Sequence, residues 1–216
     1  MPIFEEWMPH PHSLAAIWHI EEEEAFFLDK NSVRAATAHS NIKHPKRRLE
    51  HIAGRYLLQH LKEDFPLHQV ANDIHDKPRL PDNAYYFSLS HSFPYVAAII
   101  STQEECGIDI QVWKEGMHKI AHMFLSPEEQ ALSDHENTQY TLAWSAKEAA
   151  YKWNGRRGID FIADLPIKKI STKNTKFSIR DSAKHFDVKI CYKGQEISLE
   201  AALFKDFAFA LLVKDR

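Results

Sequence analysis

The chain has 216 residues, with 27 Lys or Arg and 30 Asp or Glu, so its formal net charge is −3. This slightly acidic balance disfavours a general nucleic-acid binder. No apolar run approaches the length that crosses a bilayer, so we expect no membrane association. The chain does not open with a basic segment followed by an apolar stretch, so no signal peptide is predicted. Two cysteines, Cys106 and Cys191, favour a reducing compartment, and we expect a cytoplasmic protein.

Histidine is unusually frequent, with 14 residues. Zinc sites need ligands at fixed spacings, such as two His four residues apart on a helix beside an acidic residue. His118 and His122 have that separation, but Lys119 stands where the acid would be. The sequence therefore predicts scattered surface histidines in preference to a zinc site.

The first quarter of the chain predicts one strand and two helices. Residues 14–20 predict the strand, and the acidic run Glu21–Glu24 predicts a helix with negative charge in its first turn. A longer helix is expected from about Pro45 to Asp64, because apolar residues recur at i, i+3 and i+4. Beside this apolar stripe lies a basic ridge formed by Arg48, His51 and Arg55.

Residues 85–111 predict three strands separated by turns. Tyr85–Ser90 alternates, Tyr95–Ser101 is a buried apolar run, and Gly107–Gln111 alternates again. Turns are expected at 92–94 and 103–105.

The second half predicts two helices and then a meander of strands. Ser126-Pro127 with Glu129 is a capping box, and a second helix covers about 138–153 and stops at Asn154-Gly155. Antiparallel strands are expected near 176–180, 186–192, 197–203 and 207–213.

These elements predict an α+β fold of two similar α/β subdomains. Each subdomain has a β, α, β order, and the expected architecture is a pseudo-twofold pair of antiparallel sheets packed on helices. The boundary falls near Glu104, which gives an N-terminal subdomain of residues 1–104 and a C-terminal subdomain of residues 105–216.

The helix near 141–153 carries the first candidate site. At 100° per residue, Trp144, Glu148 and Lys152 form one stripe, with Lys147 and Tyr151 beside it. Small residues on the other side favour close packing on a sheet. We expect the charged face to display a carboxylate between two ammonium groups. The simpler interpretation is an exposed i, i+4 pair between Glu148 and Lys152.

A second candidate is Asp109, which lies between Ile108 and Ile110 in a predicted strand. Because Asp is depleted in strands, its presence needs an explanation. An exposed edge strand is one explanation. The other is a carboxylate held for a hard cation such as Mg²⁺, which needs only one or two protein carboxylates. Glu148 supplies the second carboxylate if the helix packs beside the strand.

A third candidate combines Phe87–Ser92 with the upstream loop Asp76-Lys77-Pro78. Hydroxyls, an imidazole and an ammonium in this order, with Arg48 and Arg55, offer several donors to a polyanion. The sequence has neither a Gly-rich P-loop nor a dinucleotide-binding fingerprint.

Taken together in order, these strings resemble the 4′-phosphopantetheinyl transferases. The match is to the larger, monomeric, two-subdomain type, the surfactin-synthetase-activating type. The matching strings are Lys77-Pro78, Phe87–Ser92, Gly107–Ile110 and Trp144–Lys152. The helix with Arg47, Arg48 and Arg55 also resembles the family's N-terminal helix.

The resemblance implies transfer of the phosphopantetheine arm of coenzyme A to a serine of an acyl or peptidyl carrier protein, with release of 3′,5′-ADP. It implies that Asp109 and Glu148 bind Mg²⁺ and that Lys152 lies near the pyrophosphate. It further implies a coenzyme A site formed by Lys77, Pro78, Ser90, His91, Arg48, Arg55 and Lys152. The catalytic set is then Glu148, Lys152 and Asp109, with Glu148 or a water molecule taking the serine proton.

One position departs from the family pattern. The fifth residue of the strand string is often Glu and is Gln111 here. Gln offers a neutral carbonyl oxygen, so Gln111 as a metal ligand predicts weaker Mg²⁺ binding. Two other interpretations therefore stay open. One is a weakened homologue that binds coenzyme A or a carrier protein without efficient transfer, and the other is an unrelated interaction domain with a solvated charged helix.

Overall fold

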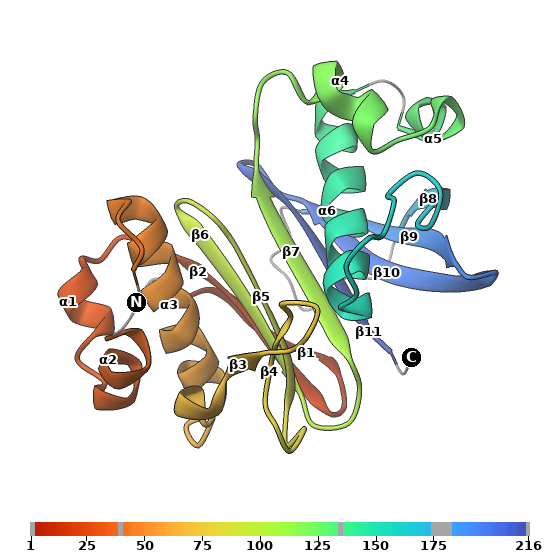
Figure 1. Ribbon diagram of the computed structural model, residues 1–216. Helices are drawn as coiled ribbons and strands as arrows, with labels where there is room; N and C mark the ends of the chain where they lie inside the picture. The colour runs from red at the N-terminus through yellow and green to blue at the C-terminus, as the bar shows by residue number, and fades with distance from the viewer. Residues whose placement is uncertain (1–2, 39–40, 134–135, 174–182, 215–216) are drawn as a thin grey trace.

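The computed structural model describes residues 3–38, 41–133, 136–173 and 183–214 (Figure 1). Its elements in chain order are β1 (Ile3–His10), β2 (Ser13–His19), α1 (Glu24–Phe27), α2 (Asn31–Thr37), α3 (Pro45–Leu61), η1 (Leu67–Gln69), β3 (Ala71–Asn72), β4 (Pro78–Arg79), β5 (Tyr86–Ser92), β6 (Tyr95–Ser101), β7 (Cys106–Val112), α4 (Met117–Ile120), η2 (Ala121–Met123), α5 (Pro127–Leu132), α6 (Asn137–Asn154), β8 (Ile167–Thr172), β9 (Lys184–Tyr192), β10 (Gln195–Leu203) and β11 (Phe207–Val213). No helix among the described residues has both the length and the apolar character needed to cross a membrane.

Two antiparallel sheets organise the chain, which confirms the predicted α+β class. The first has the strand order β1-β2-β6-β5 and the second has the order β7-β11-β10-β9-β8. One long helix packs on each sheet, α3 on the first and α6 on the second (Figure 1). The chain passes from one sheet to the other between β6 and β7, at residues 102–105.

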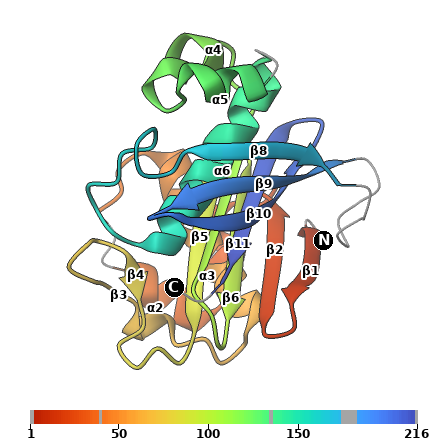
Figure 2. The same cartoon turned by 90° about the vertical axis from the view of Figure 1, so that its right-hand side faces the viewer.

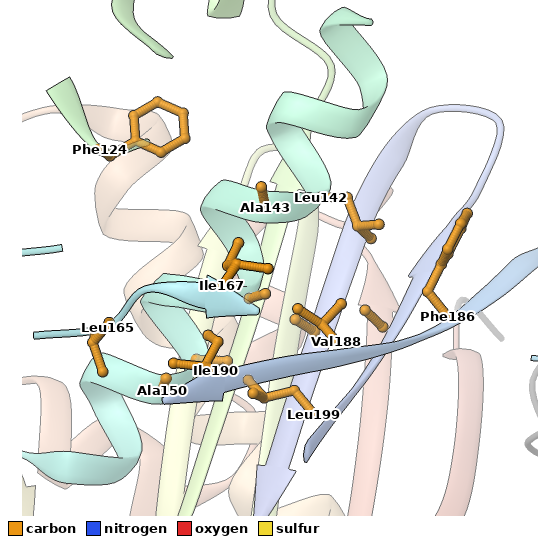
Figure 3. Packing of buried hydrophobic residues seen from close by; sticks show 14 of the residues in the cluster. Phe124, Leu142, Ala143, Ala150, Leu165, Ile167, Phe186, Val188, Ile190 and Leu199 are labelled. Atoms are coloured by element: carbon orange, nitrogen blue, oxygen red, sulfur yellow. The ribbon is translucent and has the colours of Figure 1, made fainter. Parts of the chain in front are cut away.

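The hydrophobic core has three parts. One part lies between α3 and the first sheet, and another lies between α6 and the second sheet. Figure 3 shows the latter, where Leu142 and Ala150 of α6 face Val188, Ile190 and Leu199 of the strands. The third part lies between the sheets, whose strands run across one another in Figure 2. It includes the edge-to-face pair Trp7–Phe209.

Helix α6 lies unusually close to β7 because both surfaces are small. Gly107 faces the helix, and a Cβ atom at that position would lie 2.0 Å from the Ala149 carbonyl oxygen. Ala146, Ala149 and Ala150 are fully buried on the helix side. The small-residue face predicted for this helix is therefore confirmed, and it brings the side chains of α6 and β7 into the same space.

The edge strands β5 and β7 lie side by side and are joined through serine hydroxyls. Ser88 Oγ accepts a hydrogen bond from Ile108 N at 3.2 Å, and Ser92 Oγ accepts one from Val112 N at 3.0 Å. We call this junction the serine seam, defined by Ser88, Ser90 and Ser92 on β5. The hydroxyls satisfy backbone donors of β7 that would otherwise be buried without a partner.

Both predicted helix signals in the second half are confirmed. Ser126 accepts a hydrogen bond from Glu129 N, while Glu129 Oε2 accepts one from Ser126 N at 2.8 Å. Helix α6 ends at Asn154, and Gly155 follows it in the left-handed conformation with φ 65°.

Several predictions at element boundaries were wrong. The acidic run contributes only Glu24 to α1, because Glu22 accepts a hydrogen bond from the Trp18 indole and Glu21 pairs with His19. Strands β1 and β8 and helix α2 were not predicted. Helix α3 ends at Leu61, before the expected Asp64, because the next residue is extended. The strand expected near 176–180 lies outside the described residues.

Candidate active site

The candidate site lies where α6, β7 and β5 meet. Lys152 Nζ of α6 lies 2.7 Å from Asp109 Oδ1 of β7 and 2.8 Å from Ser90 Oγ of β5. It also donates to the Ile108 carbonyl oxygen at 3.1 Å. One ammonium group therefore contacts both halves of the chain, and Lys152 does not form the simple exposed pair with Glu148 that its spacing allowed.

Asp109 is buried although β7 is an edge strand of its sheet. The residue is 5% exposed, because β5 covers that edge. Its Oδ1 accepts hydrogen bonds from Ser90 and Lys152, whereas its Oδ2 is buried and has no hydrogen-bond partner among the described residues. The interpretation of Asp109 as part of an exposed edge strand is wrong.

Glu148 is the second carboxylate of the site. Burial raises its pKa to about 7, Lys152 lowers it, and the negative charge of Asp109 raises it further. Within the described part of the chain, Glu148 forms no salt bridge. Asp109 and Glu148 thus lie within electrostatic reach of each other, and both are poorly solvated.

These two carboxylates fit a hard divalent cation. The buried, unpartnered Oδ2 of Asp109 and the desolvated Glu148 carboxylate are the oxygen ligands that Mg²⁺ prefers. No group of three or more His, Cys, Asp or Glu side chains suited to a metal occurs among the described residues. A bound Mg²⁺ would therefore take further ligands from water and substrate.

Gln111 lies on the same face of β7 as Asp109, two residues further along the strand. Its amide nitrogen donates to Ser92 Oγ at 3.0 Å and to the Val112 carbonyl oxygen at 3.1 Å. These bonds fix the side chain at the serine seam. Only its carbonyl oxygen is chemically suited to bind a cation.

Lys147 does not belong to the exposed charged face. It is 0% exposed, and its Nζ lies 2.5 Å from Glu129 Oε1 and 2.7 Å from the Phe161 carbonyl oxygen. Burial lowers its pKa, while Glu129 opposes that shift. The predicted display of Glu148 between two ammonium groups is therefore wrong, because one of them is turned into the protein.

Two neighbouring cavities are lined by Ser90 and by Lys152, the two side chains that contact Asp109. The first, of about 180 Å³, lies between α3 and β5 and is lined by His51, Arg55, Ser90 and His91. The second, of about 330 Å³, lies between the loop at 75–78 and the end of α6, and its walls include Lys77, Tyr151, Lys152 and Arg157. Both share Pro78, Phe87 and Leu89.

The wall of the first cavity contains one partly buried cation, Arg55, and one buried carboxylate, Glu50. Burial lowers the pKa of Arg55 to about 10, so its guanidinium stays protonated at neutral pH. Burial and the charges of Arg55 and His91 lower the pKa of His51 to about 4, so that imidazole is neutral there. Among the described residues, Arg55 has no carboxylate within salt-bridge distance. An anionic ligand would supply the missing charge.

Two of the proposed ligand contacts are already engaged within the protein. Lys77 Nζ lies 2.8 Å from Glu105 Oε2 and donates to the Trp153 carbonyl oxygen at 3.2 Å. Arg48 forms a salt bridge with Glu24 of α1 and lies in neither cavity wall. The structure thus brings Lys77, Pro78, Ser90, His91, Arg55 and Lys152 together and leaves Arg48 apart.

Sequence reasoning did not single out Glu50 and Glu105, which support this site. Glu105 binds Lys77 and also Arg79, whose Nη1 lies 2.7 Å from Glu105 Oε1. Glu50, in the wall of the first cavity, contacts His91. Both carboxylates find partners far away in the sequence, so local pattern gave no signal for either.

Comparison with known proteins relates the second half of the chain to one superfamily. Residues 105–211, from just before β7 into β11, match the family model of the 4′-phosphopantetheinyl transferase superfamily. This match confirms, at the superfamily level, the resemblance seen in the sequence.

Two bacterial proteins are similar to this chain over about half of its length. Each is described as 4′-phosphopantetheinyl transferase AcpT, one from Salmonella typhimurium strain LT2 and one from Escherichia coli O157:H7. Each is 32% identical over 117 residues, which is 50% of this chain. The match covers 60% of the Salmonella protein and 59% of the Escherichia coli protein, so it spans about three fifths of each relative.

Proposed function

We propose that this protein transfers the 4′-phosphopantetheine group of coenzyme A to a serine of an acyl or peptidyl carrier protein, in a reaction that requires Mg²⁺. The observation that carries this proposal is the meeting of Lys152, Asp109 and Ser90 beside Glu148, next to two neighbouring cavities that each have cationic side chains in their walls. The superfamily match of residues 105–211 supports it.

Coenzyme A, an elongated polyanion, is the substrate that the two cavities fit. Arg55 and His91 in the first cavity and Lys152 in the second offer donors to its phosphate groups, as does Arg157, which also pairs with Asp76 of the same cavity wall. Pro78, Phe87 and Leu89 form an apolar wall common to both, against which an adenine ring can pack. Lys77 contributes chiefly by holding the loop in place through Glu105.

Asp109 and Glu148 would hold Mg²⁺, with the Gln111 carbonyl oxygen as a third candidate ligand. When bound, the ion would offset negative charge on the diphosphate of coenzyme A. The protein's own groups do the rest. Lys152 stabilises the charge that develops on the leaving 3′,5′-ADP, and Ser90 keeps Lys152 oriented.

At the phosphorus atom, the transfer forms one bond to oxygen and breaks another. The carrier serine oxygen attacks the phosphorus attached to pantetheine, and the bond from that phosphorus to the ADP oxygen breaks. Glu148, directly or through a water molecule, takes the serine proton. Such a reaction needs mainly positioning and charge stabilisation from the protein, and rigid elements hold Asp109 on a strand and Lys152 on a helix.

We further propose a monomeric cytoplasmic protein with subdomains of residues 1–104 and 105–216. The carrier partner is expected to be an acidic helical protein. A suitable docking surface lies on α4 and η2, which expose Ile120, Met123 and the basic Lys119. This surface combines apolar contact with positive charge.

The test is the mass increase of an apo carrier protein incubated with coenzyme A, Mg²⁺ and this protein. Asp109→Ala and Glu148→Gln should each abolish the increase of one phosphopantetheinyl group, because each removes a carboxylate from the site. Glu196→Gln, at an exposed position of β10, should transfer normally. Normal transfer by Asp109→Ala or Glu148→Gln, with folding checked by circular dichroism, would contradict the site assignment.

Gln111 motivates a second candidate function, a weakened homologue that binds coenzyme A or a carrier without efficient transfer. The discriminating change is Gln111→Glu, which adds a carboxylate two residues from Asp109. We expect half-maximal transfer at a lower Mg²⁺ concentration in this variant. An unchanged Mg²⁺ requirement would count against Gln111 as a ligand. Binding of coenzyme A without transfer by the wild type would favour the weakened homologue.

A further inference from the structure

A buried carboxylate closes one end of the first cavity. Glu50 of α3 is 6% exposed, and its Oε2 lies 3.1 Å from His91 Nδ1. Its Oε1 accepts a hydrogen bond from Phe93 N at 2.7 Å. Glu50 therefore joins α3 to the end of β5 and to the turn that follows it, and each of its oxygens has a different partner. A carboxylate held at both oxygens has a fixed orientation.

The orientation of Glu50 determines how His91 faces the cavity. With Nδ1 directed at Glu50, Nε2 is the ring nitrogen left to meet a ligand. The His91 side chain is 48% exposed and lines the cavity together with His51 and Arg55.

We propose that Glu50 is a positioning residue that holds His91 Nε2 toward an anionic group of the donor substrate in the cavity between α3 and β5. The inference rests on the proposed function, because it takes coenzyme A as the occupant of the cavity. Glu50 touches no substrate itself. It acts through His91, and its removal would weaken the binding of coenzyme A.

The alternative is that Glu50 matters only for the backbone bond to Phe93. Glu50→Gln separates the two roles, because the amide oxygen of Gln still accepts from Phe93 N while the charge facing His91 is lost. A double-mutant cycle with His91→Ala then shows whether the effect of Glu50 passes through His91.

Coenzyme A binding is measured by calorimetry, and KM and kcat by transfer to an apo carrier protein. We expect Glu50→Gln to raise the Kd and KM of coenzyme A about tenfold, as for the loss of one charge-assisted hydrogen bond. The change in kcat should be much smaller. In the His91→Ala background, the same substitution should have no further effect. Glu63→Gln, at an exposed position just beyond α3, is the matched control.

A second measurement needs no substrate. The imidazole nitrogen resonances of His91 report which ring nitrogen carries a hydrogen bond, and the Nδ1 signal should shift in Glu50→Gln. If Glu50→Gln fails to fold, Glu50→Asp keeps the charge and shortens the reach. It should shift the same signal in a folded protein.

Equal weakening of coenzyme A binding by Glu50→Gln in the wild-type and His91→Ala backgrounds would overturn the proposal, because the effect would then bypass His91. An unchanged His91 Nδ1 signal would also overturn it. A wild-type protein that binds no coenzyme A would instead contradict the proposed function, and the imidazole signals would still decide whether Glu50 holds His91.

Discussion

At the scale of single residues, Lys152 shows how much of the site depends on one side chain. Its ammonium contacts Asp109 of the neighbouring strand β7 and Ser90 of the other sheet. The carboxylate of Asp109 is therefore half satisfied within the protein, and its second oxygen is left for a cation. The Lys152 ammonium group thus holds Asp109 and Ser90 together and leaves Asp109 Oδ2 without a hydrogen-bond partner among the described residues.

His51 provides a pH-dependent prediction at the residue scale. Its pKa is lowered to about 4 in the folded protein by burial, Arg55 and His91, whereas the unfolded value is near 6.5. Between these values the unfolded chain binds more protons, so the free energy of unfolding falls as pH drops from about 6.5 to 4. His51→Gln should therefore lose less stability than the wild type over this range.

The expected difference is on the order of 1 kcal/mol after allowing for solvent screening. Urea unfolding at pH 7.5 and pH 4.5 measures it, with the exposed His12→Gln as control. Identical pH dependence of the wild type and His51→Gln would show that His51 is protonated in the folded state, contrary to this prediction.

The residue scale also shows what sequence reasoning cannot supply. Asp109, Glu148 and Lys152 were identified because their spacing matches a known family pattern. The prediction that Lys147 lies on the exposed charged face was wrong, because a helical projection gives the angle of a side chain around the helix but not the residue that it contacts. That partner, Glu129, comes from α5. Glu50 was missed for the same reason, since its contact with Phe93 joins α3 to the turn after β5.

At the scale of elements, the buried pair of Glu129 and Lys147 attaches α6 to α5 and to the start of β8. Glu129 also accepts hydrogen bonds from Ser126 N and from Ile167 N, the latter at 2.6 Å. The capping box read from the sequence is therefore also an anchor for the helix that carries Glu148.

Lys147→Met should destabilise the protein by about 3 kcal/mol, because it leaves Glu129 buried without its cation. The control is Lys189→Met, which removes an exposed ion pair with Glu196 and should cost less than about 1 kcal/mol. Urea unfolding curves measure both. Similar losses for the two variants would mean that the buried pair contributes no more than a surface pair.

Elements with strong local signals were predicted and those shaped by tertiary contacts were not. Helices α3 and α6 have regular apolar periods, and α6 also has a Gly stop. Strand β1 is an irregular edge strand with register shifts, so it lacks a clean alternation. The acidic run before α1 looked helical, but its side chains bond to β2 instead.

At the scale of the whole molecule, the two halves are held together by the inter-sheet core and the serine seam. Ser88 is buried, and its hydroxyl is the hydrogen-bond acceptor for Ile108 N. Ser88→Ala should lower the free energy of unfolding by about 1–3 kcal/mol, because it leaves a buried amide unsatisfied. It should also speed hydrogen exchange at Ile108.

Ser171→Ala is the comparison, because its hydroxyl donates to the Asp187 carbonyl oxygen, between β8 and β9 of the second sheet and away from β7. This variant should leave exchange at Ile108 unchanged. If Ser88→Ala does not alter exchange at Ile108, the Ser88 hydroxyl does not protect that amide.

The alternation of side chains along β5 sets which residues face the site. Serines at 88, 90 and 92 alternate with Phe87, Leu89 and His91, so one face meets β7 while the other meets α3. A single-residue insertion within the strand would exchange these faces from that point onward. It would set an apolar or imidazole side chain against Asp109 and turn the hydroxyls toward α3. Substitutions in β5 can thus be absorbed one at a time, whereas a change in its length cannot.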